Sequence, residues 1–362
     1  MNRLISSLHN YSGGTFEHSK AAQLSMMLQV PVHPDQVVLA HTPLRQLGPA
    51  YRNKLVLVTG NEDVPGVAHS YGFQHAVGVN HFLRREPSLW PHTFVNTPEG
   101  RTALRFAPMP SPSHPFHTST VADVEAVMVF YDGIDWGAEM QVITDVLMRG
   151  REYRFQTNRP VFRADNDRFY GDIGAESTPD RDPFQPLLIF TNNDFVWKNE
   201  QELPRYAQGT FRMCLQAAYE KLSGRPLFFT QFGKPANAQY DYGESVLMKF
   251  AASLSSGSSS VSTAQTASKR APFSPTMNGA TTNCTSSSNS SATPPLLEKI
   301  FMIGDNPTSD IRGANAKGWE SVLVETGLFH RTSTRSNDER DPAKHVFPDV
   351  ERVVDAIISG SI

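Results

Sequence analysis

The chain has 362 residues, a hydrophobic content of 39% and a formal net charge of −3. This length and apolar content suffice for one or two buried cores, and the near balance of 33 basic and 36 acidic residues disfavours binding to nucleic acid or to an anionic membrane. Two cysteines cannot build a disulfide framework or a cysteine-rich zinc site, and no apolar run reaches the roughly 18 residues that span a bilayer. We therefore expect globular domains without a transmembrane segment.

The first half of the chain alternates between helical and strand patterns. Residues 20–28 form an amphipathic helical pattern with Ser19 as its predicted N-cap, and short apolar runs at 37–40 and 54–59 predict strands. A further apolar run at 76–79 follows a helical stretch. Continuous apolar strands between helices are typical of a parallel sheet covered on both faces, so an α/β fold is expected.

The middle of the chain continues this alternation around irregular segments. Residues 83–120 are rich in proline and histidine and predict loops, whereas a strand at 124–131 and a helix at 137–149 restore the pattern. Residues 150–186 are polar and irregular, which predicts a long surface insertion, and an apolar strand is predicted at 187–190. The α/β alternation therefore continues on both sides of this insertion.

The last part of the chain combines helices with a low-complexity tract. A helical stripe at 210–222 ends before Gly224, a strand is predicted at 227–229, and a helix is predicted at 237–250. Between residues 252 and 294 the composition is dominated by Ser, Thr, Ala and Asn, with almost no large apolar side chains. Such a composition cannot offset the entropy of ordering, so this tract is predicted to be a disordered insert.

Two carboxylates follow the last predicted apolar strand. Residues 299–304 form an apolar run that stops at Asp305, and a helix is predicted to open at Pro307 and to include Asp310. Open α/β sheets bind ligands at the carboxyl ends of their strands, and two carboxylates at such a position suit Mg²⁺. The plainer alternative is a helix N-cap together with a surface acid.

A lysine follows the strand predicted at 227–229. Gly233-Lys234-Pro235 places an ammonium group between a strand and a helix, where it can neutralise a phosphoryl oxygen, and Gly233 lets the backbone approach a ligand. Alone, such a triplet is most often an ordinary turn. It is not a Walker loop, because the upstream glycine and the Ser or Thr after the lysine are missing, and no Gly-x-Gly-x-x-Gly after a strand supports a nicotinamide-dependent oxidoreductase.

In this order and on consecutive strands, the lysine and the two aspartates resemble motifs three and four of the haloacid dehalogenase-like hydrolase superfamily. Within it, the chain is similar to the mitochondrial family of cat eye syndrome critical region protein 5. The resemblance implies Mg²⁺-dependent, phosphatase-type phosphoryl transfer on a small phosphorylated metabolite. Asp305 would then bind the metal, Asp310 would support the metal from outside its coordination sphere, and Lys234 would orient the nucleophile and the phosphate. The stretches that carry the second likeness are His18-Ser19-Lys20-Ala21, residues 35–43 and residues 205–211.

The resemblance also implies a Rossmann-like parallel-sheet hydrolase core that is interrupted by an inserted α/β cap domain of class IIA type. The core would comprise residues 1–43 and 198–362, and the cap would comprise residues 44–197 with the irregular insertion inside it. Asn192 and Asp194 belong to a Thr-Asn-Asn-Asp turn that resembles the one with which such caps return the chain to the core, and they become candidate substrate-binding residues. From the residues alone, the same turn is an Asx turn after a strand.

One element that the resemblance implies is missing from these residues. Superfamily chemistry needs an apolar strand that ends in Asp-x-Asp, whose first carboxylate attacks phosphorus and whose second transfers protons. This element is expected before residue 1, so the core is expected to be N-terminally incomplete. Motif two is altered, with Asn10, Ser12 and Gly13 as its candidate substrate-binding residues. The open alternative is a catalytically inactive relative that acts as a binding or scaffold protein.

Compartment and partners follow from the resemblance rather than from the residues. It implies a mitochondrial protein with a link to glycerophospholipid metabolism, and a cytoplasmic location is the alternative. The expected partner is a small phosphorylated metabolite and not a nucleic acid, and a homodimer is compatible with the family.

Overall fold

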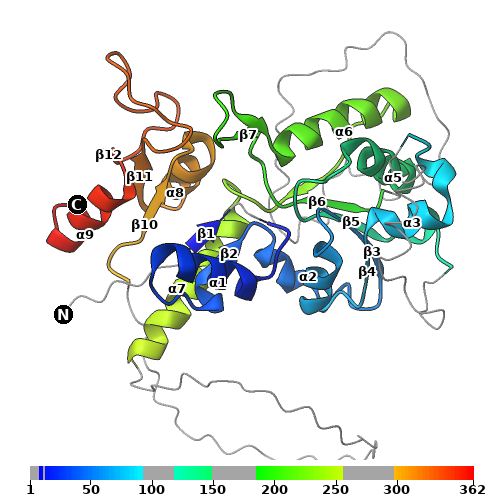
Figure 1. Ribbon diagram of the computed structural model, residues 1–362, viewed down its shortest axis with the longest axis horizontal. Coiled ribbons are helices and arrows are strands. Elements are labelled where there is room, and N and C mark those ends of the chain that lie inside the picture. Colours follow the sequence, from blue (N-terminus) through cyan, green and yellow to red (C-terminus); the bar gives the residue numbers. More distant parts are fainter. Residues whose placement is uncertain (1–7, 11–12, 93–117, 149–184, 256–296) are drawn as a thin grey trace, which may run out of the picture.

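The computed structural model describes residues 8–10, 13–92, 118–148, 185–255 and 297–362 (Figure 1). Ser12, most of the predicted surface insertion at 150–186 and nearly all of the predicted Ser/Thr-rich insert at 252–294 lie outside these described residues.

The largest sheet has five strands, and every pair of neighbours in it is parallel. Its central strand β5 lies beside β6 with Val129 opposite Phe190. The apolar runs of the sequence form these strands because both faces of the sheet are buried. In sheet order, the strands are β4 (His75–Val77), β3 (Leu55–Thr59), β5 (Ala126–Val129), β6 (Leu187–Phe190) and β9 (Thr230–Gln231).

Helices cover both faces of this sheet, and the sheet separates two apolar cores. Val127 and Val129 of β5 face the core that contains residues of α5 and α6, whereas Ala126 and Met128 face the core that contains residues of α2. This alternation is the period of two that a strand imposes on its side chains. Figure 1 shows α5 and α6 on the opposite side of the sheet from α2. The helices are α2 (Val64–Ser70), α3 (Val79–Arg85), α5 (Trp136–Met148) and α6 (Gln208–Ser223).

The remaining parallel strands form two smaller sheets. One contains β1 (Leu8–Asn10) and β2 (Val37–Leu39), and the other contains β10 (Phe301–Gly304), β11 (Glu320–Val324) and β12 (His345–Phe347) in that order. Within the described residues, β1 and β10 each pair with a strand on one side only. The helices of this part are α1 (Glu17–Leu28), α7 (Asn237–Ser255), α8 (Arg312–Ala316) and α9 (Val350–Ser359).

Short elements complete the described chain. Two short strands, β7 (Val196–Trp197) and β8 (Arg205–Tyr206), form an antiparallel hairpin. The 3-10 turns are η1 (Pro34–Gln36), η2 (Thr42–Leu47), η3 (Pro87–Leu89) and η5 (Val121–Asp123), and a π-helical turn, η6 (Pro307–Ile311), opens at the expected proline.

The parallel sheets with flanking helices confirm the expected α/β architecture, with three local corrections. The first helix begins at Glu17 after Phe16, so Ser19 is not its N-cap. Part of the expected loop at 83–120 belongs to α3 and η3, because Phe82 and Leu83 are buried against the large sheet. The strand expected at 227–229 lies at 230–231 instead.

The large sheet extends beyond residue 197, where the cap was expected to end. Both α6 and β9 pack on it, and β9 pairs with β6 through Ile189 and Phe190. We therefore propose that the cap runs to about residue 232.

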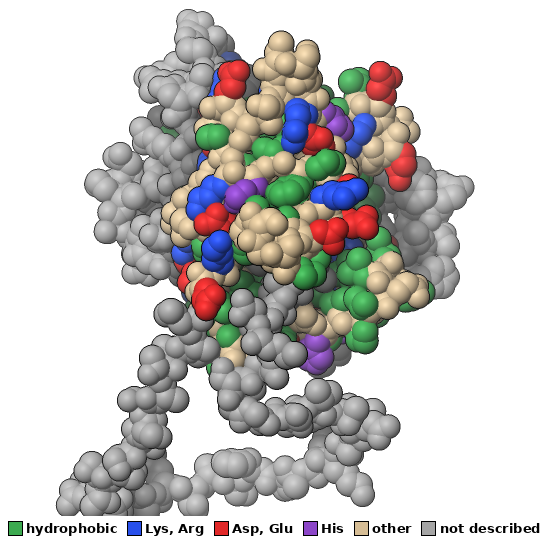
Figure 2. Space-filling model, turned by 90° about the vertical axis from the view of Figure 1, so that its left-hand side faces the viewer, with side chains coloured by type: hydrophobic (Ala, Val, Ile, Leu, Met, Phe, Trp, Pro, Cys, Tyr) green, Lys and Arg blue, Asp and Glu red, His purple; other side chains and the backbone are tan. Residues whose placement is uncertain are grey.

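Figure 2 shows the face formed by the C-terminal segment, on which basic and acidic side chains are interspersed, in line with the small net charge.

Candidate active site

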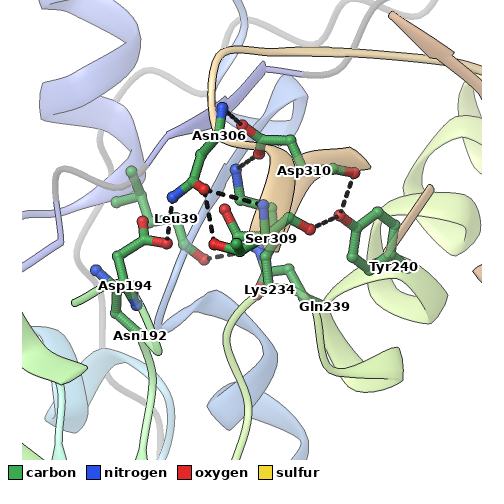
Figure 3. A network of polar contacts seen from close by, with 10 residues as sticks. Leu39, Asn192, Asp194, Lys234, Gln239, Tyr240, Asn306, Ser309 and Asp310 are labelled. Carbon is green, nitrogen blue, oxygen red and sulfur yellow. Dashed lines mark hydrogen bonds and ion pairs between the residues drawn. The ribbon is translucent and has the colours of Figure 1, made fainter. Parts of the chain in front are cut away.

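The carboxyl ends of three parallel strands meet at one place. The turn 191–194 follows β6, Lys234 follows β9, and Asp305 follows β10. Side chains from these three strand ends and from η6 form one polar network (Figure 3). The structure therefore brings together the lysine, the two aspartates and the turn that the sequence singled out.

The centre of the network is an ion pair between Lys234 and Asp310. The two side chains are in direct contact, and the residues are 5% and 2% exposed. Asn306 donates its backbone N–H to the second carboxylate oxygen of Asp310 at 3.1 Å. Gly304 is required beside this carboxylate, since a Cβ there would lie 2.2 Å from Asp310 Oδ2. A buried pair between groups 76 residues apart fixes β9 against η6.

Tyr240 of α7 holds the same turn from the other side. Its hydroxyl donates to the carbonyl oxygens of Ser309 at 2.9 Å and of Asp310 at 3.0 Å. Burial raises the pKa of the Tyr240 hydroxyl, and the nearby Asp310 and Asp194 raise it further, so this group remains a donor. Helix α7 therefore positions the Asp310 backbone while Lys234 positions its carboxylate.

Asp194 joins the network through Asn306. The Asn306 amide donates to Asp194 Oδ1 at 2.9 Å, and its oxygen accepts from the N–H and the hydroxyl of Thr308 at 3.1 and 2.8 Å. Asn192 accepts from the backbone N–H of Asp194 at 2.9 Å, which is the Asx turn that the sequence allowed. The turn after β6 is thus tied directly to the turn after β10.

Negative charge dominates this network. Burial raises the pKa of Asp194 to about 7, the ammonium of Lys234 lowers it, and the charges of Asp310 and Asp305 raise it. Three carboxylates therefore interact electrostatically around a single lysine. Such an excess of carboxylate favours the arrival of a cation.

Asp305 lies at the rim and is partly exposed. Its Oδ2 accepts from the backbone N–H of Leu328 at 2.8 Å, and its carbonyl accepts from Phe329 N–H at 3.2 Å. A Cβ at Gly327 would lie 1.9 Å from the same Oδ2, so a glycine is needed there. The segment after β11 therefore orients the Asp305 carboxylate.

The described residues contain no group of three or more His, Cys, Asp or Glu side chains arranged to hold a metal by themselves. Mg²⁺ commonly takes only one or two protein carboxylates, together with waters and substrate phosphate. Asp305 and Asp310 with the surplus negative charge fit that smaller requirement. No helix within the described ranges is long and apolar enough to cross a membrane.

The motif-two candidates Asn10 and Gly13 lie next to strand ends that border the lysine network (Figure 3). Asn10 ends β1 opposite Leu39, whose carbonyl accepts from Gln239 of α7 at 3.5 Å. Gly13 lies against the end of β5, since a Cβ there would be 3.0 Å from the Phe130 carbonyl oxygen. The structure thus places Gly13 at the cap sheet, while Ser12 lies outside the described residues.

The chain is similar to two curated mitochondrial proteins. A Cardiolipin synthase (CMP-forming) / mitochondrial hydrolase fusion protein of Schizosaccharomyces pombe is 29% identical over 93% of this chain, which spans 44% of that protein. A mitochondrial hydrolase of Saccharomyces cerevisiae is 30% identical over 88% of this chain and 76% of the relative. The HAD-hydrolase-like family model matches residues 269–353, which include Asp305 and Asp310. The chain belongs to the haloacid dehalogenase-like hydrolase superfamily.

Solved structures agree with this superfamily at the level of the fold. A p-nitrophenyl phosphatase of Archaeoglobus fulgidus matches with a TM-score of 0.51 and 14% identity, over 97% of this chain and 85% of that one. A glycerol phosphate phosphatase of Mycobacterium tuberculosis, in complex with magnesium, matches with a TM-score of 0.50 and 13% identity, over 96% of this chain and 66% of that one. These likenesses confirm the Rossmann-like core with a cap domain.

Sequence reasoning missed two residues of the network. Asn306 stands before Pro307, where its N-cap role is visible, but its contact with Asp194 spans 112 residues and leaves no local pattern. Tyr240 lies in a helix whose sequence gives no sign that its hydroxyl is buried against η6. Only the packing of α7 against the C-terminal part reveals that role.

Proposed function

We propose that this superfamily member is a Mg²⁺-dependent hydrolase that performs phosphatase-type phosphoryl transfer on a small phosphorylated metabolite. The observation that carries the proposal is the buried Lys234–Asp310 pair inside a network with three carboxylates. This combination provides one fixed positive charge for a phosphoryl oxygen and an anionic rim for a divalent cation. The phosphatase names of the two structural neighbours support it.

Each residue of the site has a proposed role that follows from its position. Lys234 orients the phosphate and stabilises its negative charge, and Asp310 holds the lysine in place. Asp305 offers the partly exposed carboxylate that would bind Mg²⁺, which when bound would polarise the phosphoryl oxygens. Asn192 and Asp194 bring the cap to this site through Asn306, while Asn10, Ser12 and Gly13 are proposed to contact substrate.

The type of cap, the cellular location and the metabolic role are also part of this proposal. The order of the elements supports a class IIA cap between a first core part at 1–43 and a second core part that begins near Gly233. The names of the two curated relatives support a mitochondrial location, and the fusion with a cardiolipin synthase in one of them supports a link to glycerophospholipid metabolism. A homodimer remains a prediction.

Phosphate release is the first test. With p-nitrophenyl phosphate and a panel of small phosphomonoesters, activity should require Mg²⁺ and vanish with a chelator. Lys234→Met and Asp305→Asn should lower kcat/KM by at least roughly a hundredfold. Lys317→Met is the matched control, because Lys317 also pairs with an aspartate, Asp241, but this ion pair is exposed. Equal losses in all three variants would exclude the assigned roles.

A second candidate is phosphate binding without turnover. It is favoured by the sequence, in which Asp-x-Asp occurs only at Asp165-Asn166-Asp167 and Asp180-Arg181-Asp182, both outside the described residues. Calorimetry with inorganic phosphate and Mg²⁺ separates the two candidate functions when it is paired with turnover assays. These assays would use this chain and the longest naturally expressed protein that contains it. Binding with turnover supports the hydrolase, binding without turnover supports the second candidate, and absence of binding contradicts both.

A further inference from the structure

Two carboxylates at the end of β5 carry buried oxygen atoms that lack hydrogen-bond donors. Asp132 follows β5 by three residues, and Glu139 lies in the first turn of α5. Asp132 Oδ1 and Glu139 Oε2 are shielded from solvent, and neither has a partner within the described part of the chain. Because a buried carboxylate oxygen without a donor costs free energy, both atoms need an explanation.

The two carboxylates face the same turn. A Cβ at Gly133 would lie 2.0 Å from both oxygens of Glu139, so this carboxylate lies directly against the turn that carries Asp132. Glu139 is only 6% exposed, whereas Asp132 is partly exposed and the neighbouring Ile134 is 79% exposed. The pair therefore consists of an inner acid and an outer acid that has a route to the surface.

Burial strongly disfavours the charged form of both groups. It raises the pKa of Asp132 to about 6 and that of Glu139 to about 8, and the charges of Asp135 and Asp132 add to the second shift. The Asp135 carboxylate already accepts a hydrogen bond from the Ala138 backbone N–H at 3.0 Å, at the start of α5. A positive group beside these acids would favour the charged form of Glu139, which at neutral pH is otherwise mostly neutral.

The pair lies at the same sheet edge as the lysine network. Thr191, which opens the turn that leads to Asp194, donates its hydroxyl to the Phe130 carbonyl oxygen at 2.9 Å, two residues before Asp132. Strands β5, β6 and β9 are successive neighbours, so the ends of β5 and β9 are separated by roughly 10 Å. A small phosphorylated molecule held at Lys234 can span that distance.

We infer that Asp132 and Glu139 form a cap subsite for a primary ammonium group on the non-phosphate part of the substrate. This inference rests on the proposed function, because it takes Lys234 as the phosphate end. An ammonium group supplies up to three donors for the orphaned oxygens and the charge that lets both acids ionise. A hydroxyl would supply a donor but no charge.

Binding, which does not depend on turnover, tests this subsite. Calorimetry in Mg²⁺ would compare aminoalkyl phosphates of increasing chain length with hydroxyalkyl phosphates of the same length and with inorganic phosphate. The aminoalkyl series should contain a length that binds at least roughly tenfold more tightly than its hydroxyl counterpart. Equal affinities at every length would overturn the subsite, while failure of all ligands, including phosphate, would instead contradict the proposed function.

Isosteric variants then assign the preference to the two acids. Asp132→Asn and Glu139→Gln should each remove the preference for the ammonium compound and leave the affinity for the hydroxyl compound within roughly twofold. Asp145→Asn is the control, because Asp145 lies on the same helix and is hydrogen-bonded to Gln141. Circular dichroism would confirm that each variant is folded. A preference that persists in both acid variants would also overturn the inference.

Discussion

Two of the carboxylate clusters in the described residues, one around Glu17 and one formed by Asp132 and Glu139, differ in how their oxygen atoms are satisfied. Glu17 of α1 accepts hydrogen bonds from the hydroxyls of Thr42, at 3.0 Å, and of Tyr71, and the Arg45 guanidinium lies 3.3 Å away. At Asp132 and Glu139, by contrast, one oxygen of each carboxylate has no donor within the described residues. Glu17 Oε1 therefore has donors without a ligand, whereas Asp132 Oδ1 and Glu139 Oε2 have none.

The difference separates a structural role from a proposed binding role. The Glu17 cluster joins three segments, α1, η2 and the end of α2, and Arg45 also lies over the Tyr71 ring at 4.7 Å. These contacts anchor the entry to the cap. The other cluster joins nothing of comparable extent, so its unsatisfied oxygens are explained by a ligand rather than by stability.

The largest expected effect comes from breaking the satisfied cluster. Glu17→Gln keeps the shape of the side chain but turns one acceptor into a donor that faces Thr42, Tyr71 and Arg45. We expect the free energy of unfolding to fall by about 3 kcal/mol, because the hydrogen bonds from Thr42 and Tyr71 to a buried charged acceptor are lost. The half-exposed Arg45 guanidinium also loses its ion-pair partner. Denaturant unfolding measures this change. Glu351→Gln, on the exposed face of α9, is the control, and an equal effect in both variants would refute the assignment.

The next effect concerns His41, which is fully buried beside the Glu17 cluster and contacts the Tyr71 hydroxyl at 2.9 Å. Burial lowers the pKa of His41 from 6.5 to about 4, the charge of Glu17 raises it and that of Arg45 lowers it. Between those two values the unfolded chain binds more protons, so stability rises with pH and is lost as pH falls from 6.5 toward 4. The loss should reach about 3 kcal/mol.

A variant isolates this histidine from other titrating groups. His41→Asn should flatten the stability profile between pH 4 and 6.5 relative to the parent chain, when both are followed by denaturant unfolding at each pH. His18, which lies on α1 and is exposed, provides the matched control in His18→Asn. If the parent and His41→Asn profiles run parallel, the acid sensitivity belongs to other residues.

The comparison also shows what a sequence reveals about such clusters. The positions of Asp305, Asp310 and Lys234 were predictable because strand ends leave a local pattern, an apolar run followed by a turn. Their proximity in space followed only from the family resemblance. Glu17 and Tyr71 are 54 residues apart, and no periodic pattern in the sequence predicts their contact.

The extent of the large sheet and the orphaned pair were beyond sequence reasoning for related reasons. Strand β9 has only two residues, too few for a period, so its place in the large sheet depends on pairing with β6. In the sequence, Glu139 is indistinguishable from an ordinary surface acid in the first turn of a helix, where a negative charge interacts favourably with the helix dipole. Its burial follows from how the turn at Gly133 folds back on it, which no local pattern predicts.

The smallest expected effect has the opposite sign and is the sharpest test of the comparison. Glu139→Gln is the same chemical change as Glu17→Gln, but it should stabilise the folded chain by about 2 kcal/mol at pH 6. The pKa of Glu139 is raised from 4.5 to about 8, so the folded state favours the neutral acid, and its contribution to stability is lost as pH rises through that range. Glutamine stays neutral and avoids this loss. Below pH 4.5 the two chains should be equally stable, and denaturant unfolding at both pH values measures the difference. A loss of stability at pH 6 would show that this carboxylate is satisfied like Glu17, and the contrast between the two clusters would be refuted.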